Sequence, residues 1–294
     1  MSFRNFASRL FISQPEQRLR AGWRVSIQTI LLLLVSFILI VPARLALLFI
    51  PANTSITLLL LEIVSLAAIT ISVFLARRYL DRRTFTSLGF QTGSRVWRDL
   101  LAGFLIAGVT LLLVYLFEFS ASYLRLTSIA WQDTSPIEII LGLGIMLAAF
   151  VATGWQEELY FRGYLLQNLA DGLNLGWGVL LSSVIFGLAH LSNPNASWMG
   201  ALGVGVAGLF MAFAYYRTRQ LWLPIGLHIG WNFFEGPLLG FPVSGIGTFQ
   251  LLHNQIDGPI LLTGGSFGPE AGLVLLPALL VGTALVYIYS KITQ

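Results

Sequence analysis

The sequence predicts an all-α, polytopic membrane protein, and three observations support that prediction. Only 10% of the 294 residues are charged, whereas soluble domains usually have ~25%. Hydrophobic residues make up 56% of the chain, and its mean hydropathy is +0.80. Apolar stretches close to the ~20 residues that a spanning helix needs recur along the chain. This composition excludes an ordinary soluble enzyme, a disordered chain and a nucleic-acid binder.

Eight apolar stretches are predicted to span the membrane as one domain over residues 25–294. Before them, residues 1–24 hold five arginines between apolar residues. We expect this basic segment to lie in the cytoplasm, either as a short interfacial helix on anionic lipid or as a tail. The predicted spans are approximately 25–41, 57–76, 99–117, 139–168, 177–192, 197–216, 221–239 and 271–290.

The distribution of basic residues predicts the orientation of these spans. If the N-terminus is cytoplasmic, 14 of the 17 Lys and Arg residues fall in cytoplasmic segments. Arg44 and Arg125 fall on the opposite side, and Arg162 lies within a span. The positive-inside rule therefore predicts that both termini are cytoplasmic. The two halves of the chain show no repeat, which disfavours a transporter built from repeated units.

The chain contains no cysteine. A thiolate zinc site, an iron–sulfur cluster and a cysteine nucleophile are therefore all excluded. Any chemistry must use Glu, Asp, His, Ser, Asn or Arg side chains, or a metal held by nitrogen and oxygen.

The fourth predicted span carries an acidic motif that is costly inside a membrane. The sequence QEELYFR runs from Gln156 to Arg162, and one charged side chain at mid-bilayer costs ~2.5–3.5 kcal/mol. Glu158 and Arg162 are four residues apart, so they share a helix face and are predicted to form an ion pair. Glu157 points ~100° away and is a candidate general base. The alternative is a buried Glu–Arg pair with a spare acid near the interface.

Two later spans add further polar residues. The sequence FGLAH ends at His190, and GLHIGWN runs from Gly226 to Asn232. A single histidine near a helix end is usually a satisfied polar residue without a catalytic role. His228 and Asn232, however, are four residues apart and share a face, and Gly226 and Gly230 have the spacing that lets two helices approach closely. Convergence of these groups in one wet cavity explains all of them together.

Such a cavity predicts activation of a water molecule. Glu157 would act as the base, with His190 orienting the water. His228 and Asn232 would donate hydrogen bonds to the oxyanion of a tetrahedral intermediate. Glu157, His190 and His228 also form an acceptable ligand set for catalytic zinc. No His-Glu-x-x-His motif selects zinc, however, so we favour a site without a cofactor.

Two other features receive weaker interpretations. The pentapeptide Gly264–Gly268 matches the G-x-S-x-G pattern of serine hydrolases. That pattern forms a nucleophile elbow only between a strand and a helix of an α/β sheet, which we do not expect here. It ends a Gly- and Pro-rich outer loop, about residues 240–270, that we interpret as a lid or cap. Glu62 in the second span has no assigned partner, and we interpret it as a polar link to the cavity.

The spacing of these polar residues resembles the CAAX-protease and bacteriocin-processing (CPBP, or Abi) family of intramembrane proteases, which includes the type II CAAX prenyl endopeptidases. The three motifs of that family are E-E-x-x-x-R, F-x-x-x-H and H-x-x-x-N. The motif region covers about residues 139–239. The motifs occur in order as Glu157-Glu158…Arg162, Phe186…His190 and His228…Asn232.

The resemblance implies an intramembrane endopeptidase with eight helices. It implies that Glu157 and His190 activate water and that His228 and Asn232 hold the oxyanion. Glu158, Arg162 and Phe186 would be structural support. Members have been described both as metalloproteases and as glutamate proteases, so zinc remains an alternative to a metal-free site. These seven residues are the predicted site: Glu157, Glu158, Arg162, Phe186, His190, His228 and Asn232.

The resemblance also limits the partners. We expect a protein or peptide substrate, lipidated if the protein performs CAAX-type C-terminal processing, together with membrane lipids and no nucleic acid. The basic N-terminus and the Gly-rich loop look more like the bacterial members, which favours a bacterial cytoplasmic membrane. Two alternatives are a non-catalytic immunity or scaffold protein of the same fold and a proton- or ion-coupled transporter that uses the acids and histidines as a relay.

Overall fold

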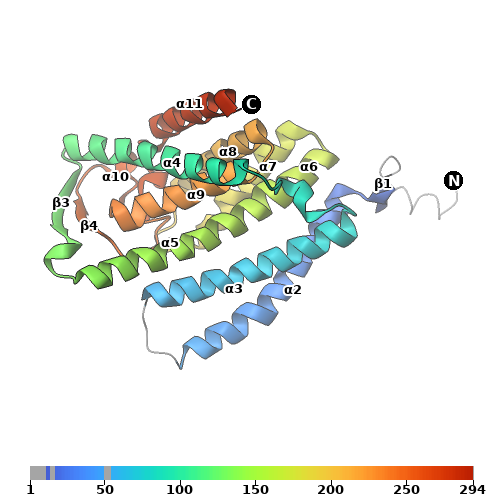
Figure 1. Cartoon of the computed structure of the whole chain (residues 1–294), viewed down its shortest axis with the longest axis horizontal. Helices are drawn as coiled ribbons and strands as arrows, with labels where there is room; N and C mark the ends of the chain where they lie inside the picture. The colour runs from blue at the N-terminus through green and yellow to red at the C-terminus, as the bar shows by residue number, and fades with distance from the viewer. Residues whose placement is uncertain (1–10, 14–16, 50–53, 294) are drawn as a thin grey trace.

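The structure is a computed structural model that describes residues 11–13, 17–49 and 54–293 (Figure 1). Each of the eight predicted spans coincides with a helix. Residues 1–10, which contain Arg4 and Arg9 of the predicted basic segment, lie outside the described residues. The eight helices are α2 (Ala21–Leu47), α3 (Thr54–Leu75), α4 (Arg95–Ser120), α5 (Pro136–Glu158), α7 (Leu175–Ala189), α8 (Trp198–Thr218), α9 (Trp222–Phe233) and α11 (Leu275–Thr293).

Seven helices in the described part of the chain are long and apolar enough to cross a membrane. The protein is therefore a polytopic helical membrane protein. The remaining predicted span is formed by α9, which has 12 residues and continues as the π-helical turn η6 (Phe234–Leu238). Because α9 is shorter than a spanning helix needs to be, the count of eight stays a prediction, and so does the cytoplasmic side of both termini.

Polar caps begin three of these helices. Ser135 accepts a hydrogen bond from the Glu138 amide before α5, and Glu138 bonds back to complete a capping box. Asn174 and Ser197 cap α7 and α8 in the same way. The first amide groups of a helix have no partner within the helix, so side-chain oxygens satisfy them. These caps explain why the helices begin where they do.

The fourth span is longer than its predicted range of 139–168. Helix α5 continues without a break through the π-helical segment η4 (Leu159–Leu165) into α6 (Leu166–Gly172). The π-helical segment begins directly after Glu158, and single π-helical turns inside α-helices often occur at functional sites. The extension to Gly172 leaves Glu157 well inside the helix instead of at its end.

Helix α9 is the centre of the bundle. It is buried along most of its length and lies between α4 and α5 (Figure 1). A Cβ atom at Gly226 would lie 2.2 Å from the Leu100 carbonyl oxygen, and one at Gly230 would lie 2.5 Å from the Phe104 carbonyl oxygen. The two glycines therefore allow the close approach of α4 that their spacing predicts. Helices α2 and α3, in contrast, pack together at the edge of the bundle (Figure 1).

Short strands correct the prediction of a purely helical chain. Strand β3 (Leu124–Ile129) pairs antiparallel with β4 (Leu252–Ile256) and joins the α4–α5 connection to the outer loop. Near the N-terminus, β1 (Ile12–Ser13) pairs with β2 (Arg18–Leu19), and α2 begins at Ala21, before the predicted start at residue 25. These strands are too short to produce a clear alternating pattern, and their partners are distant in sequence or come through tight turns.

The outer loop is mostly structured. After β4 it forms the one-turn helix α10 (Ile260–Thr263) and two 3₁₀ turns, η7 (Gly265–Phe267) and η8 (Pro269–Ala271). The G-x-S-x-G match therefore lies in consecutive turns and not between a strand and a helix of an α/β sheet. This geometry agrees with the expectation that the pentapeptide is not a nucleophile elbow.

Candidate active site

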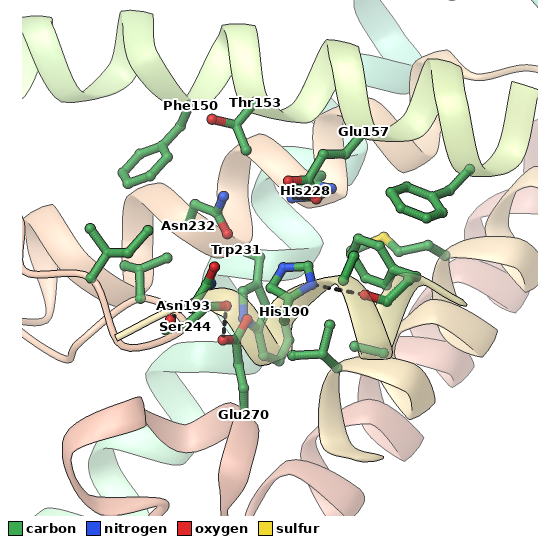
Figure 2. A pocket seen from close by; sticks show the side chains of 18 of the residues that line it. Phe150, Thr153, Glu157, His190, Asn193, His228, Trp231, Asn232, Ser244 and Glu270 are labelled. Atoms are coloured by element: carbon green, nitrogen blue, oxygen red, sulfur yellow. Dashed lines mark hydrogen bonds and ion pairs between the residues drawn. The ribbon is translucent and has the colours of Figure 1, made fainter. Parts of the chain in front are cut away.

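The four predicted catalytic residues line one cavity of about 220 Å³ (Figure 2). Glu157 comes from α5 just before η4, and His190 comes from the 3₁₀ turn that follows α7. Both His228 and Asn232 come from α9. The lining is a mixture of aromatic, aliphatic and polar side chains. Its polar members are Glu62, Thr153, Glu157, His190, Asn193, His228, Asn232, Ser244 and Glu270.

Glu158 lies behind the cavity wall and is fully buried. Its Oε1 atom accepts a hydrogen bond of 2.8 Å from Nη1 of Arg162 and another of 2.8 Å from Nδ1 of His228. Arg162 also donates to the Gly208 carbonyl oxygen at 3.2 Å. The predicted ion pair is thus present, and it ties α5 to α8 and α9. A buried pair of this kind needs such additional hydrogen bonds to offset the loss of hydration.

Glu157 faces the cavity, and its side chain is 23% exposed. Its Oε2 atom lies 3.6 Å from Nε2 of His228, and within the described residues it has no hydrogen-bond partner. The adjacent acids therefore have different surroundings, because Glu158 is held by Arg162 and His228 while Glu157 retains an oxygen without a donor. Such an oxygen can accept a proton from a water in the cavity.

His190 is held in place by the end of its own helix. Its Nδ1 atom donates to the Phe186 carbonyl oxygen at 2.9 Å, because a carbonyl oxygen can only accept. In the neutral ring, Nε2 therefore has a free lone pair. The His190 ring also packs edge-to-face on Phe186, with ring centroids 4.9 Å apart. In the view of Figure 2, His190 lies between the Glu157–His228 pair and Glu270.

Phe186 connects the polar groups of the site. The Arg162 guanidinium lies 4.3 Å from the centre of its ring, a cation–π arrangement. The His228 ring packs edge-to-face on it at 6.2 Å. Phe186 is buried, so it orients Arg162, His190 and His228 without presenting a polar atom of its own.

Asn232 lies one helical turn after His228 on α9, is buried, and lines the cavity. Because α9 packs closely on α4 through its glycines, both side chains are held at fixed depth. His228 uses Nδ1 to donate to Glu158, which leaves Nε2 on the cavity side near Glu157. Two side chains of one helix thus line the same cavity.

Glu62, interpreted from the sequence as a polar link to the cavity without an assigned partner, is part of the cavity wall. Glu62 lines the cavity from α3 and accepts a hydrogen bond of 3.0 Å from Oγ1 of Thr153. It also accepts a short hydrogen bond from Nε2 of Gln156. Both donors lie on α5, so Glu62 joins α3 to the helix that carries Glu157. A lone carboxylate in an apolar span was the available signal, but nothing in its spacing identified these partners.

Glu270 is a further acid of the cavity wall, and sequence reasoning did not include it. It lines the cavity from η8, is buried, and accepts a short hydrogen bond from Oγ of Ser244. Burial raises the pKa of the Glu270 carboxyl, and the hydrogen bond from Ser244 offsets part of the rise. Glu235 of η6 is also buried, and its charge would raise the free energy of an ionised neighbour.

The alternative zinc ligands do not form a preorganised metal site. Among the described residues, no group of three His, Asp or Glu side chains is close enough to hold one ion. His190 donates from Nδ1 to a backbone carbonyl and His228 donates from Nδ1 to Glu158, which leaves Nε2 of each ring available, so these bonds do not themselves exclude a metal. A catalytic zinc ion needs three protein ligands around one point. As they are placed, Glu157, His190 and His228 do not fit that requirement.

Comparison with known proteins agrees with the motifs. Residues 139–234 match the family model described as Type II CAAX prenyl endopeptidase Rce1-like. The chain is 28% identical over 167 residues to Uncharacterized protein YyaK of Bacillus subtilis (strain 168), covering 55% of this chain and 54% of the relative. It is 32% identical over 111 residues to a protein of the same organism named "Putative membrane peptidase YdiL", covering 38% of this chain and 41% of the relative.

The chain therefore spans about half the length of the curated relatives that it matches. No solved structure matches it. The segment that matches the family model contains the Glu-Glu-x-x-x-Arg, Phe-x-x-x-His and His-x-x-x-Asn motifs. This segment is therefore similar to the Rce1-like type II CAAX prenyl endopeptidases.

Proposed function

We propose that this protein is an intramembrane endopeptidase that hydrolyses a peptide bond in the cavity between α5, α7 and α9. The observation that carries the proposal is the position of Glu157, which faces the cavity with an oxygen that has no hydrogen-bond donor in the described chain. A carboxylate oxygen without a hydrogen-bond donor is costly in a membrane protein unless it has a function. Hydrolysis requires a base of this kind close to a water molecule.

In the proposed reaction, Glu157 takes a proton from a water as the water oxygen attacks the carbonyl carbon of the substrate. His190 accepts a hydrogen bond at Nε2 from the same water, because its Nδ1 is occupied by the Phe186 carbonyl. The carbonyl oxygen becomes an oxyanion, which Asn232 stabilises through its side-chain amide and His228 through a proton at Nε2. Donors placed in advance for this charge can lower the barrier by several kcal/mol.

Glu158, Arg162 and Phe186 support this arrangement without contacting the substrate. Glu158 orients the His228 ring through Nδ1, and Arg162 offsets its charge. Phe186 packs against the rings of both histidines. All three residues are buried, and Glu158 and Arg162 lie outside the cavity lining, whereas Phe186 forms part of it.

The proposed substrate is a protein or peptide segment that enters from the membrane. A family of this name supports CAAX-type C-terminal processing as one form of the activity, for which the substrate would carry a lipid. The relative named as a membrane peptidase supports the broader class of reaction, and both Bacillus relatives support a location in a bacterial cytoplasmic membrane. We also propose that the reaction needs no metal, because the alternative ligands do not surround one point.

The test uses the purified full chain in detergent micelles and in liposomes. An internally quenched peptide library, with and without a C-terminal prenylcysteine, is the substrate probe. We expect cleavage of at least one peptide class, loss of cleavage in His190→Ala, and full activity after chelation and dialysis. If His190→Ala cleaves as fast as the wild type, the role of His190 is wrong. Loss of activity on chelation, with recovery on adding zinc, would replace the metal-free mechanism.

The same experiment separates the two alternative functions. A scaffold or immunity protein would show no cleavage, and its Glu157→Gln variant would still complement a deletion strain. A transporter would show ion or proton flux across the liposome membrane that depends on Glu157. Either result, together with an absence of cleavage, would remove the endopeptidase proposal.

A further inference from the structure

Glu270 is an acid of the cavity wall that lies outside the family-matched segment. The match ends at residue 234, whereas Glu270 belongs to the η8 turn before α11. It nevertheless lines the same cavity as Glu157 and His190. In the view of Figure 2, Glu270 and Ser244 lie on one side of His190, and Glu157 and His228 lie on the other. The cavity therefore has acids on two walls that come from distant parts of the chain.

The backbone around Glu270 is seated by close packing. A Cβ atom at Gly203 of α8 would lie 1.8 Å from the Glu270 carbonyl oxygen, so only glycine permits this contact. Gly268 has φ of +108°, and a Cβ there would lie 2.2 Å from the Pro242 carbonyl oxygen. Two glycines are thus required to bring the η8 turn against α8 and the 242–245 segment.

Apolar packing on both sides of Glu270 makes the turn part of the wall. Phe267 and Ala271 are buried in one cluster with Phe161 and Phe186, the residues that surround Arg162 and the histidines. Because Phe186 also contacts His190, the position of the turn is coupled to the position of the histidine. The 240–270 segment therefore forms one wall of the cavity, whereas its composition predicts only a lid or cap.

Burial favours the protonated form of Glu270 over the ionised form. Its direct hydrogen bond comes from a neutral hydroxyl, that of Ser244. The described residues that line the cavity include no Lys or Arg. The charges of His190 and His228 would lower the pKa of Glu270, whereas the charge of Glu157 raises it, and Glu235 is a further acid beside it. With burial raising its pKa, Glu270 keeps a proton nearer to neutral pH than an exposed acid does.

We infer that Glu270 is the general acid of the reaction, which donates its proton to the nitrogen of the departing amine. This inference rests on the proposed peptidase function. Glu157 and Glu270 then form a base and an acid on opposite walls, an arrangement in which two similar groups receive different roles from different surroundings. An amine leaves a tetrahedral intermediate as a neutral molecule only if its nitrogen is protonated, so hydrolysis of an amide needs such a donor.

The proton balance of the cycle is complete with these two acids. Water gives one proton to Glu157, and its oxygen forms the new bond to the carbonyl carbon. The carbon–nitrogen bond breaks, its electron pair stays on nitrogen, and that nitrogen takes the proton of Glu270. The products are a carboxylic acid and an amine. Glu157 then releases its proton and Glu270 regains one through water in the cavity, which restores the starting state.

The test compares an amide substrate with a thioester of the same sequence. The best-cleaved peptide of the library is synthesised with a thioester at the scissile position and assayed with the purified full chain. A thiol of pKa about 8.5 leaves as an anion and needs no proton from the enzyme. We expect Glu270→Gln to lower amide hydrolysis about 10²–10³-fold, and to change thioester hydrolysis by less than about threefold, because the acid then has no role.

Three further variants make the result specific. Glu157→Gln should lower hydrolysis of both substrates, because both need the activated water. Glu118→Gln changes another fully buried acid, on α4 and away from the lining residues, and should leave both rates unchanged. Ser244→Ala removes the hydrogen bond that orients Glu270 and should lower amide hydrolysis alone, by about tenfold.

The outcomes separate this inference from the proposed function. Retained thioester hydrolysis also shows that Glu270→Gln is folded, and Glu270→Asp should recover part of the amide activity. Equal losses for amide and thioester in Glu270→Gln, or no loss for the amide, would overturn the general-acid role while leaving the peptidase proposal intact. If the wild type cleaves no peptide and no thioester, the proposed function fails and the inference fails with it.

Discussion

The glutamates on the two sides of the cavity have different neighbours. On the α5–α9 wall, Glu157 and Glu158 are adjacent in sequence, and Arg162 and His228 lie beside them. On the other side, Glu270 of η8 lines the cavity and accepts its hydrogen bond from a hydroxyl, and Glu235 of η6 is a buried acid near it that does not line the cavity. A neighbouring cation stabilises a carboxylate, whereas burial without one stabilises the neutral acid.

This difference shows how a small cavity can provide both a base and an acid. In the proposed mechanism, Glu157 on the first wall accepts a proton from water and Glu270 on the second wall donates one to the leaving amine. All four residues are glutamates, so the difference in their roles comes from the side chains that surround each carboxyl group. Four substitutions test this comparison.

The largest effect is expected from Glu157→Gln. The variant retains the size of the side chain but removes the base, so kcat for peptide cleavage should fall about 10⁴-fold, the upper range for a general base. Cleavage of the quenched peptide by purified protein measures the loss, and Glu118→Gln serves as the matched control. A fall of less than tenfold would mean that Glu157 is not the base.

Arg162→Met should have the next largest effect, on stability. It leaves Glu158 buried beside His228 without its cation, and removal of one partner of a buried pair costs about 3–5 kcal/mol. Equilibrium unfolding in mixed micelles measures this free energy. The double variant Glu158→Gln/Arg162→Met should recover much of it, because no uncompensated charge remains. Wild-type stability in the single variant would show that the ion pair does not support the α5–α9 wall.

Asn232→Ala should reduce the rate without disrupting the fold. Loss of one oxyanion donor lowers kcat about 10²–10³-fold, or about 2.7–4 kcal/mol. Because the donor acts mainly in the transition state, KM should change little. Steady-state kinetics separate the two parameters, and Gln255→Ala on exposed β4 is a suitable control. A rise in KM at constant kcat would assign Asn232 to substrate binding.

Glu62→Gln should have the smallest effect of the four. Glutamine can still accept the hydrogen bonds from Thr153 and Gln156, although bonds to a neutral acceptor are weaker. We expect a change of about 0.5–1.5 kcal/mol in stability, and a change in kcat/KM of less than about tenfold. A loss as large as that of Glu157→Gln would move the base to α3 and change the assignment of the first wall.

Much of the fold was predictable because hydropathy is a local property. All eight apolar stretches coincide with helices, and the Ser135–Glu138 capping box is visible in sequence. The pairing of β3 with β4 was not predictable, because strands of five or six residues joined across more than 100 residues leave no local pattern. The predicted span 221–239 corresponds to α9 followed by η6, but the change from α-helix to π-helix was not predictable, because it does not alter hydropathy.

The residues of the candidate site also divide into those that the sequence could identify and those that it could not. Glu158 and Arg162, and likewise His228 and Asn232, are related by the four-residue spacing of a helix, so each pair could be placed on one face. Glu62, Ser244 and Glu270 are single polar residues, and their partners lie on other segments. Residues with a periodic relation to a neighbour, or with a place in a family motif as for Glu157 and His190, could be assigned before the structure was known.

The sequence by itself determined the membrane class, the positions of the helices and the polar residues that the membrane tolerates at a cost. It determined these because the cost of burying a charge and the period of a helix are the same in every fold. The tertiary structure decided which of two adjacent acids faces the cavity and which is held by Arg162 and His228. It also decided that Glu270 shares that cavity, because glycine contacts between α8 and the η8 turn bring together residues that no local pattern relates.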